Sequence, residues 1–388
     1  MKDNKNSAVI TSAARTVIGS FEGSLSNLQG HELGAVAIQE VLKRSKIKPI
    51  EVDEVIMGQV LTGGAGQNPA RQAAVKSGIP LNKPAYVVNQ VCGSGLRSIV
   101  SGYQAILNGD ANIVVAGGQE SMTNASYKIN TDKGKKLSKS ELQDIMIYDG
   151  LWDAFYNYHM GVTAENVATK WKISRDDQDN FAFLSQSKAQ KAIQDKKFED
   201  EIIKVGKLIQ DEYPRKDVTK KTLSRLKPVF KKGGTVTAGN SSGINDGAAA
   251  VILMTEKEAN KRNLTSMGRI VSWATCGVDP SVMGTGPIPA SRKALEKANW
   301  SVKDLDLVEA NEAFASQSIV VARELKIPIE KVNVNGGAIA LGHPIGASGA
   351  RIIVTLLHEM KKRNAKKGLA TLCIGGGMGI AMCIERKS

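Results

Sequence analysis

Two halves of this chain repeat each other at a nearly constant spacing. SGLRSIV at residues 94–100 resembles SGARIIV at 348–354, an offset of 254 positions. VDEV at 52–55 resembles LDLV at 305–308 (offset 253), and VAGG at 115–118 resembles IGGG at 374–377 (offset 259). Such short matches can arise by chance in sequence rich in glycine, alanine and valine, but three at nearly one offset favour an internal duplication. The chain is predicted to contain two similar halves.

Each half alternates strand-like and helix-like patterns. The first half is predicted to form strands at 8–12, 54–60, 85–89 and 113–116, and helices at 31–46, 69–77 and 95–108. The second half is predicted to form strands at 269–274, 306–310 and 331–335, helices at 289–297, 312–325 and 347–363, and a final hairpin of 369–375 and 378–385. This alternation predicts an α/β fold with a mostly parallel sheet covered by helices.

A different segment, from Gln119 to about Gly234, separates the halves. It is rich in lysine, interleaved with acids, and contains a predicted helix at 175–195 but little strand signal. A long insertion in an α/β domain is usually functional, although a solvated charged excursion fits the composition equally well. We therefore expect an N-terminal domain of residues 1–265, with the insertion at about 119–234, and a C-terminal domain of residues 266–388.

Composition limits the classes of protein that fit. The chain has 388 residues, of which 42% are hydrophobic and 23% charged, which excludes a disordered or fibrous chain. Its net charge of +14 favours acidic partners such as phosphates or nucleic acid. No run of about 18 apolar residues is present, so no membrane span is expected. Four cysteines and an N-terminus without a signal-peptide pattern predict a cytoplasmic location.

Cys92 is the first candidate catalytic residue, because VCGSG (91–95) lies between a predicted strand and a predicted helix. A thiol at this junction should face free backbone N–H groups and the positive end of the helix dipole, which lowers the thiol pKa and favours the thiolate. The flanking glycines allow a substrate to approach the backbone closely. The alternative, a cysteine that is only a small buried hydrophobic residue, stays open.

His343 and Cys373 are the next candidates. His343 lies at the matching strand-to-helix junction of the second half, which makes it a natural base for Cys92. Cys373 precedes IGGG (374–377), where a thiol could transfer protons and glycine N–H groups could bind an oxyanion. For His343 a surface loop, and for Cys373 a position in the core, are the alternatives.

No cofactor signature accompanies these residues. The histidines, cysteines and carboxylates have no metal-ligand spacing, so no metal site is expected. No G-x-G-x-x-G follows a strand and no Walker A sequence is present, so no nucleotide cofactor is expected.

Four segments together resemble the active-site blocks of the thiolases. They occur in the family's order, and the resemblance extends from about residue 8 to residue 385. The segments are VCGSG (91–95), NEAFA (311–315), GHP (342–344) and CIGGG (373–377). The resemblance implies the thiolase fold, in which two similar βαβαβαββ halves form a layered αβαβα core with an inserted loop domain that binds coenzyme A (CoA).

The resemblance also implies a mechanism. Cys92 would take the acyl group from a first acyl-CoA, His343 would accept the Cys92 proton, and Cys373 would remove the α-proton of a second acetyl-CoA. Asn311, through a water, and His343 would stabilise the enolate, while the backbone N–H groups of Cys92 and Gly375 would stabilise the tetrahedral intermediate. Losing one such donor typically costs about 10²–10³ in rate.

Further segments imply a short-chain substrate. GLWDAF (150–155) and YHMG (158–161) resemble the short-chain acetoacetyl-CoA thiolases, in which a His-Met pair narrows the acyl pocket. TAGNSSG (237–243) resembles the family's pantetheine-contacting loop, and basic residues of the insertion would face the CoA phosphates. The residues implied to bind substrate or CoA are Leu151, His159, Met160, Arg215, Ala238, Ser242, Met283 and Phe314.

We therefore expect a reversible acyltransferase of fatty acid metabolism that joins two acetyl-CoA into acetoacetyl-CoA and CoA. It would work through an acetyl-cysteine, with no cofactor besides its CoA substrates and no membrane partner, as a homotetramer. The alternatives are a degradative 3-ketoacyl-CoA thiolase with longer substrates, and a non-catalytic protein that binds acyl-CoA or nucleic acid. The absence of a nucleic-acid motif or concentrated basic arm disfavours nucleic acid.

Overall fold

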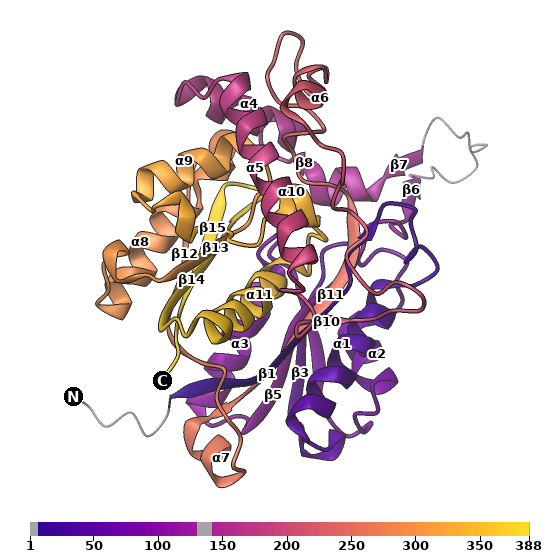
Figure 1. The fold of residues 1–388 in the computed structure, drawn as a ribbon. Coiled ribbons are helices and arrows are strands. Elements are labelled where there is room, and N and C mark those ends of the chain that lie inside the picture. The colour runs from indigo at the N-terminus through magenta and orange to yellow at the C-terminus, as the bar shows by residue number, and fades with distance from the viewer. Residues whose placement is uncertain (1–6, 130–141, 388) are drawn as a thin grey trace.

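The computed structural model describes residues 7–129 and 142–387 (Figure 1). The central sheet has 11 strands, of which nine follow the order β13-β14-β15-β12-β1-β11-β5-β3-β4, while β10 pairs with β1 and β2 with β11. The first half supplies β1 (Ala8–Thr16), β2 (Gly19–Ser20), β3 (Glu54–Gly58), β4 (Ala85–Val88), β5 (Ile113–Ser121), β10 (Ile202–Ile203) and β11 (Asn245–Thr255). The second half supplies β12 (Gly268–Gly277), β13 (Leu307–Ala310), β14 (Lys367–Ile374) and β15 (Met378–Glu385).

The strand order confirms the duplication. In the first half, β3 and β5 are parallel, and β11 and β1 follow as antiparallel neighbours. In the second half, β13 and β14 are parallel, and β15 and β12 follow in the same way. The halves join where β1 pairs with β12 over Val9–Ile10 and Gly268–Arg269.

Helices cover both faces of each half and complete the layers (Figure 1). The central layer consists of α3 and α11, which contact each other and the strands of both halves. On the outer faces, α1 and α2 pack on the first half, and α8 and α9 pack on the second. Their bounds are α1 (Gly30–Ser45), α2 (Pro69–Lys76), α3 (Ser94–Asn108), α8 (Pro287–Ala298), α9 (Ala315–Leu325) and α11 (Ser348–Arg363). This is the αβαβα architecture predicted from the sequence.

Local sequence explains the ends and the burial of these elements. A capping box between Gln29 and Glu32 starts α1, Pro69 starts α2, and Gly109, with a positive φ of 82°, ends α3. All nine residues of β5 are buried because helices cover the sheet on both sides, which accounts for its nearly continuous apolar run.

Three expectations for this sheet failed. The sheet is mixed and not mostly parallel, because β11 pairs antiparallel with both β5 and β1, and β15 pairs antiparallel with both β14 and β12. The strand expected at 331–335 is instead a 3₁₀ turn, Ile329–Lys331, followed by Asn333 at a φ of 44°. The side chain of Asn333 accepts from the N–H of Ala310 at 2.9 Å and donates to its carbonyl at 2.8 Å, so it occupies the hydrogen-bonding groups that a further strand would use. Conversely, β11 was not predicted, although it is buried over ten of its 11 residues.

The insertion lies at one end of the sheet, at the top of Figure 1. The predicted helix at 175–195 is confirmed as α5, whereas the short strands were not predicted. Because β5 continues through Ser121, the first residues of the expected insertion, from Gln119, belong to the sheet. Its described elements are β6 (Tyr127–Ile129), β7 (Leu142–Asp144), a π-helical turn (Met146–Leu151), β8 (Trp152–Asp153), β9 (Tyr158–His159), α4 (Met160–Lys170), α5 (Arg175–Gln194) and α6 (Lys220–Ser224).

The two central helices approach each other at a matched pair of glycines. A Cβ atom added to Gly95 on α3 would lie 2.7 Å from the backbone nitrogen of Ala350, and one added to Gly349 on α11 would overlap the backbone nitrogen of Leu96. Gly95 and Gly349 are equivalent positions of the repeat, so the helices cross about a shared point where only glycine fits.

Replacing Gly349 with alanine should therefore destabilise the protein. The obstructing atoms are backbone atoms that cannot rotate away, so we expect the free energy of unfolding to fall by about 1–3 kcal/mol in urea denaturation. Gly277→Ala is the control, because its added Cβ would lie 3.9 Å from the nearest atom. Equal stability of the two variants would contradict this account of the crossing.

Candidate active site

Cys92 lies in a tight turn between β4 and α3. The preceding residue, Val91, has a φ of 46°, which is unfavourable for a β-branched side chain. The hydroxyl of Ser94 holds the turn closed, since it accepts from the N–H of Gln90 at 2.9 Å and donates to the carbonyl of Val91 at 2.6 Å. Backbone strain therefore occurs directly beside the candidate nucleophile, a place where such strain is often functional.

The first and last of the four sequence blocks meet at Cys92. The backbone N–H groups of Gly375 and of Cys92 itself lie near enough to the Cys92 sulfur to favour its thiolate. A thiolate at Cys92 would raise the pKa of Cys373, so each thiol lies within reach of charge on the other. The contact is tight, because a Cβ added to Gly375 would lie 3.3 Å from a methyl carbon of Val91. The two N–H groups expected to bind a tetrahedral intermediate thus converge on one sulfur.

The expected lowering of the Cys92 pKa is wrong. Burial of the thiol raises its pKa to about 11, and the N–H groups of Gly375 and Cys92 offset only part of this effect. Burial and the neighbouring Cys92 also raise the pKa of Cys373. Desolvation outweighs the helix dipole here because protein atoms surround Cys373 completely and Cys92 for the most part. Both thiols are therefore neutral near pH 7, and forming a thiolate requires a nearby base.

His343 is held in a form that can serve as this base. The Ser348 hydroxyl donates to the carbonyl of Pro344 at 2.9 Å, so it can only accept from Nδ1 of His343, which lies 2.6 Å away. Nδ1 then carries the proton and Nε2 is free to accept one. Burial, assisted by the charge of Arg351, lowers the pKa of His343 to about 3, which keeps the ring neutral. Asn245 fixes its backbone by accepting from the His343 N–H at 2.9 Å.

Asn311 faces the same ring. Its side-chain nitrogen lies 3.5 Å from both ring nitrogens of His343. Its backbone N–H donates to Thr371 on β14 at 2.9 Å, and its carbonyl accepts from Gln317 at 3.1 Å. Asn311 and His343, expected together at the enolate, are therefore neighbours.

The predicted acyl-pocket residues fall into two apolar clusters. Met160, Met283, Phe314 and Cys373 pack in one cluster, with the partly buried Phe230 against it. Leu151 packs in a second cluster that also contacts Cys92, whose buried members are Val60, Leu61, Met122, Ile145, Met146 and Ile345. The catalytic thiols are thus lined by apolar side chains from both halves and the insertion.

His159 belongs to an aromatic stack beside the first cluster. Its ring lies 4.7 Å from the ring of Phe230 at an interplanar angle of 15°, and Phe230 meets Phe314 edge-on at 6.1 Å. Nδ1 of His159 accepts from the N–H of Gly161 at 3.0 Å, and Gly161 leaves room for the Phe230 ring. Burial lowers the pKa of His159 and favours its neutral form. The role of Phe230 was not predicted from the sequence.

The loop 237–243 docks on the block that carries Asn311. The Ser242 N–H donates to Ala313 at 3.0 Å, and the Asn240 carbonyl accepts from Ala315 at 2.9 Å. Ala238 is exposed and Ser242 is half-buried, so both remain within reach of a ligand. The loop therefore borders the site.

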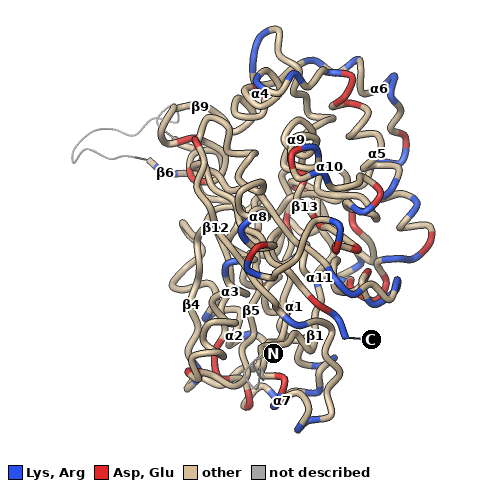
Figure 2. Tube along the Cα trace, turned by 90° about the vertical axis from the view of Figure 1, so that its left-hand side faces the viewer, with Lys and Arg blue, Asp and Glu red and all other residues tan. Residues whose placement is uncertain are grey.

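The ring of Tyr213 lies between Arg215 and this loop. The Arg215 guanidinium stacks over Tyr213 at 5.4 Å and donates to the Tyr213 hydroxyl at 3.1 Å. The Tyr213 ring fills the space in front of Gly243. Lys and Arg positions are frequent along the neighbouring part of the insertion around α6 (Figure 2). The exposed ones in residues 215–232 are Arg215, Lys216, Lys220, Lys221, Arg225, Lys227, Lys231 and Lys232.

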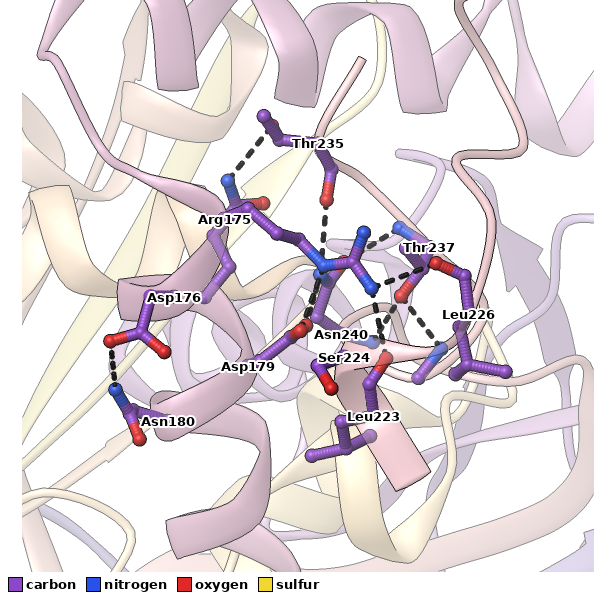
Figure 3. A network of polar contacts seen from close by, with 12 residues as sticks. Arg175, Asp176, Asp179, Asn180, Leu223, Ser224, Leu226, Thr235, Thr237 and Asn240 are labelled. Atoms are coloured by element: carbon purple, nitrogen blue, oxygen red, sulfur yellow. Dashed lines mark hydrogen bonds and ion pairs between the residues drawn. The ribbon is translucent and has the colours of Figure 1, made fainter. Parts of the chain in front are cut away.

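A polar network that the sequence did not reveal ties this loop to the insertion (Figure 3). Asn240 accepts from the N–H of Thr237 at 2.8 Å and donates to Asp179 on α5 at 2.9 Å. Arg175 pairs with Asp179 at 2.8 Å and donates to the carbonyls of Leu223 and Leu226, each at 2.8 Å. The network connects the basic segment around α6 to the loop that borders the site.

Glu120 was also missed, although the sequence carried a signal for it. It is the only charged residue of β5. Every residue of this strand is buried. Charged residues are almost never fully buried unless they are paired or hydrogen-bonded. Glu120 accepts three backbone hydrogen bonds close to Cys92.

Comparison with known proteins establishes the family. The model "Thiolase, N-terminal domain" matches residues 8–257, and "Thiolase, C-terminal domain" matches residues 264–386. The chain therefore belongs to the thiolase family.

Individual relatives match over almost their full length. An acetyl-CoA acetyltransferase of Paracoccus denitrificans is 60% identical, covering 98% of this chain and 99% of that protein. One of Rhizobium meliloti (strain 1021) is 59% identical with the same coverage. The crystal structure of the Bacillus anthracis acetyl-CoA acetyltransferase has a TM-score of 0.95 at 44% identity, covering 98% of this chain and 99% of that one.

Two features are absent from the described residues. Within residues 7–129 and 142–387, no helix is long and apolar enough to cross a membrane. Over the same residues, no group of three or more histidines, cysteines and carboxylates is arranged to hold a metal ion.

Substituting Asp179 with asparagine should loosen the loop and the α6 segment together. The change removes the charge that pairs with Arg175 and one acceptor of a buried network, a loss of about 1–2 kcal/mol in local stability. We expect trypsin to cleave residues 215–232 about five- to thirtyfold faster, because cleavage follows local opening.

Asp176→Asn is the matched control, because exposed Asp176 accepts, among the residues that the structure describes, only from Asn180 on the same helix, at 2.9 Å. Its cleavage rate should equal that of the unsubstituted protein. Equal rates for both variants would contradict a role of the network in holding this segment.

Proposed function

We propose that this protein is an acetyl-CoA C-acetyltransferase, which condenses two acetyl-CoA into acetoacetyl-CoA and CoA and also catalyses the reverse thiolysis. The observation that carries the proposal is the convergence of Cys92, Cys373 and the Gly375 N–H at one point, with a neutral His343 beside Asn311. The names of the similar proteins support the same activity.

The first step forms an acetyl-enzyme. Nε2 of His343 accepts the proton of Cys92, and the sulfur attacks the thioester carbon of acetyl-CoA. The N–H groups of Cys92 and Gly375 stabilise the oxyanion of the tetrahedral intermediate. As this intermediate collapses, the carbon–sulfur bond to CoA breaks, and His343 returns the proton to the departing CoA thiolate. The neutral tautomer held by Ser348 supports this sequence.

The second step forms the carbon–carbon bond. His343 accepts the proton of Cys373, whose thiolate removes the α-proton of a second acetyl-CoA, and the resulting enolate attacks the acetyl group on Cys92. Asn311, through a water, and the protonated His343 stabilise the enolate oxygen, and Cys92 leaves as a thiolate that takes the proton back from His343. Burial, which raises the pKa of Cys373, makes its thiolate a stronger base and so favours removal of a weakly acidic proton.

Substrate recognition is assigned to the surrounding clusters. The aromatic and methionine side chains close the acyl site around a short chain, the loop 237–243 contacts pantetheine, and the basic insertion faces the CoA phosphates. The proposed contacts are Leu151, His159, Met160, Met283, Phe314, Ala238, Ser242 and Arg215. The eight exposed cations of residues 215–232, against one acid, Asp217, support a phosphate-facing surface.

Several broader assignments accompany this function. We propose that residues 1–265, with the CoA-binding insertion at about 119–234, and residues 266–388 form the two thiolase domains. We further propose that the protein acts in fatty acid metabolism, in the cytoplasm, as a homotetramer, and that it uses no cofactor besides its CoA substrates.

Replacing Cys92 with alanine should abolish the reaction. Without the nucleophile no acetyl-enzyme forms, and thiolysis of acetoacetyl-CoA should fall by about 10⁴-fold or more. Loss of acetoacetyl-CoA absorbance measures the rate, and mass spectrometry detects the acetylated peptide. Cys276→Ala, which removes a partly exposed thiol on β12, should keep the rate.

Two results would overturn this assignment. Full activity of Cys92→Ala would exclude Cys92 as the nucleophile. Faster thiolysis of long-chain 3-ketoacyl-CoA than of acetoacetyl-CoA, by the unsubstituted protein, would favour the degradative alternative.

Replacing Cys373 with alanine should separate the two steps. Condensation should fall by about 10²–10⁴-fold, the usual contribution of a general base. Exchange of label between CoA and acetyl-CoA, which needs only the first step, should stay within about tenfold of the original rate. Cys383→Ala, which removes another buried thiol, is the control. Equal loss of exchange and condensation would contradict the division of roles.

A further inference from the structure

The carboxylate of Glu120 connects two separate segments of the chain. Glu120 lies on β5 and is fully buried. One oxygen accepts from the N–H of Val60 at 3.0 Å and of Gly346 at 2.9 Å, and the other accepts from Leu61 at 3.2 Å. Among the described residues, Glu120 takes part in no ion pair. A carboxylate suits this position because it is an acceptor on both oxygens, and all three partners are donors.

The segments that Glu120 holds enclose the nucleophile. Val60, Leu61 and Ile345 belong to the apolar cluster against which Cys92 packs. Gly346 follows Ile345, and a Cβ added there would lie 2.6 Å from the carboxylate oxygen of Glu120. The place of this cluster around Cys92 is therefore set by hydrogen bonds to one side chain.

The repeat gives this contact a counterpart in the other half. Gly346 lies 254 residues after Cys92, so the two occupy equivalent strand-to-helix junctions. At Cys92, the N–H of Gly375, directly after β14, points at the sulfur. At Gly346, the carboxylate of Glu120, near the end of the equivalent strand β5, accepts the backbone N–H. Each strand end thus contacts the junction of the opposite half.

Glu120 also acts on Cys92 through its charge. Its carboxylate is close enough for its charge to disfavour the Cys92 thiolate. Burial raises the pKa of Glu120 itself to about 7, although the three N–H groups oppose this effect. The other titratable or charged groups around this pair are Cys373 on β14, His343 before α11, Asp246 on β11 and Arg351 on α11.

We propose that Glu120 is a positioning residue of the reaction: it fixes the Val60–Leu61 and Ile345–Gly346 backbones around Cys92, and its charge adds to burial in opposing loss of the thiol proton until His343 removes it. The positioning part rests on the proposed function, whereas the coupling of charge between Glu120 and Cys92 does not. A neutral Cys92 in the free enzyme is protected from premature oxidation or alkylation, since the thiolate is the reactive form.

The coupling can be tested in the unsubstituted protein. Iodoacetamide alkylation of the Cys92 peptide, followed by mass spectrometry, reports the thiolate fraction as a function of pH. If Glu120 ionises near pH 7 and opposes thiolate formation, the logarithm of the rate should rise with a slope below one between about pH 6 and 8, and with a slope of one on either side. A slope of one throughout would overturn the coupling.

Glu120→Gln identifies the group responsible. In this variant the slope should be one throughout. Alkylation at pH 8 should be about three- to tenfold faster, because a fall of the Cys92 pKa by up to about one unit raises the thiolate fraction by up to tenfold. Asp246→Asn is the matched control: Asp246 is also buried, but it accepts from Thr123 and not from Val60, Leu61 or Gly346. It should keep the shallow region, at a lower pH because the charge of Asp246 contributes to the raised pKa of Glu120. Persistence of the shallow region in Glu120→Gln, or its loss only in Asp246→Asn, would overturn the proposal.

A kinetic measurement tests the positioning role. Displacement of the backbone around Cys92 should lower kcat for thiolysis in Glu120→Gln by about 10–100-fold, with KM for CoA unchanged within about twofold. A loss that appears in KM alone, or an unchanged kcat, would overturn the positioning role. If the unsubstituted protein had no thiolase activity, the proposed function would fail, and the alkylation profile would still decide the coupling.

Discussion

The close contact between α3 and α11 determines how the rest of the molecule is arranged. Gly95 and Gly349 let the two helices meet backbone to backbone in the middle layer. Because each helix begins at the strand-to-helix junction of its own half, their crossing brings the two junctions together. Cys92 at one junction and Ile345, two residues after His343, at the other therefore belong to one apolar cluster despite their distance in sequence. A larger residue at either glycine would separate the halves at the point where they must meet.

Burial gives this site its chemical character. Enclosure raises the pKa of Cys92 to about 11 and lowers that of His343 to about 3, so the resting groups are uncharged. In the proposed reaction, charge develops only as the bonds change, in surroundings where fixed N–H dipoles stabilise an oxyanion more strongly than water would. Ser348 fixes the imidazole and Asn245 fixes the backbone of His343, which would avoid reorganisation at the moment of proton transfer. The same burial that makes the Cys92 thiol a weaker acid in the resting protein holds the surrounding donors and the imidazole in fixed positions.

The sequence predicted those features that depend on local pattern. The repeat and the alternation of strands and helices predicted the layered fold, and the four blocks predicted which side chains the fold brings together. The strand at 331–335 failed because the Asn333 side chain takes the hydrogen bonds of Ala310, a contact that apolar periodicity does not encode. The prediction of a lowered Cys92 pKa failed because it used only the position of Cys92 before a helix, which is local, whereas burial depends on the whole fold. The Arg175–Asp179–Asn240 network joins segments that are distant in sequence, so no spacing of residues predicts it.

The duplication raises the question of why two equivalent junctions yield a single nucleophile. Both junctions lie against the same pair of helices, so a second thiol at position 346 would compete for the same small volume. The chain has glycine there, and Glu120 closes the space by accepting the Gly346 N–H. At the other junction, the backbone N–H of Cys92 remains available to bind an oxyanion, and the N–H of Gly375 is a second such donor. The two halves have thus diverged in polarity: one junction presents donors to a reacting oxygen, and the other has its donor already satisfied by a carboxylate. In the proposed mechanism, the second half contributes the base and the second thiol instead of a second copy of the site.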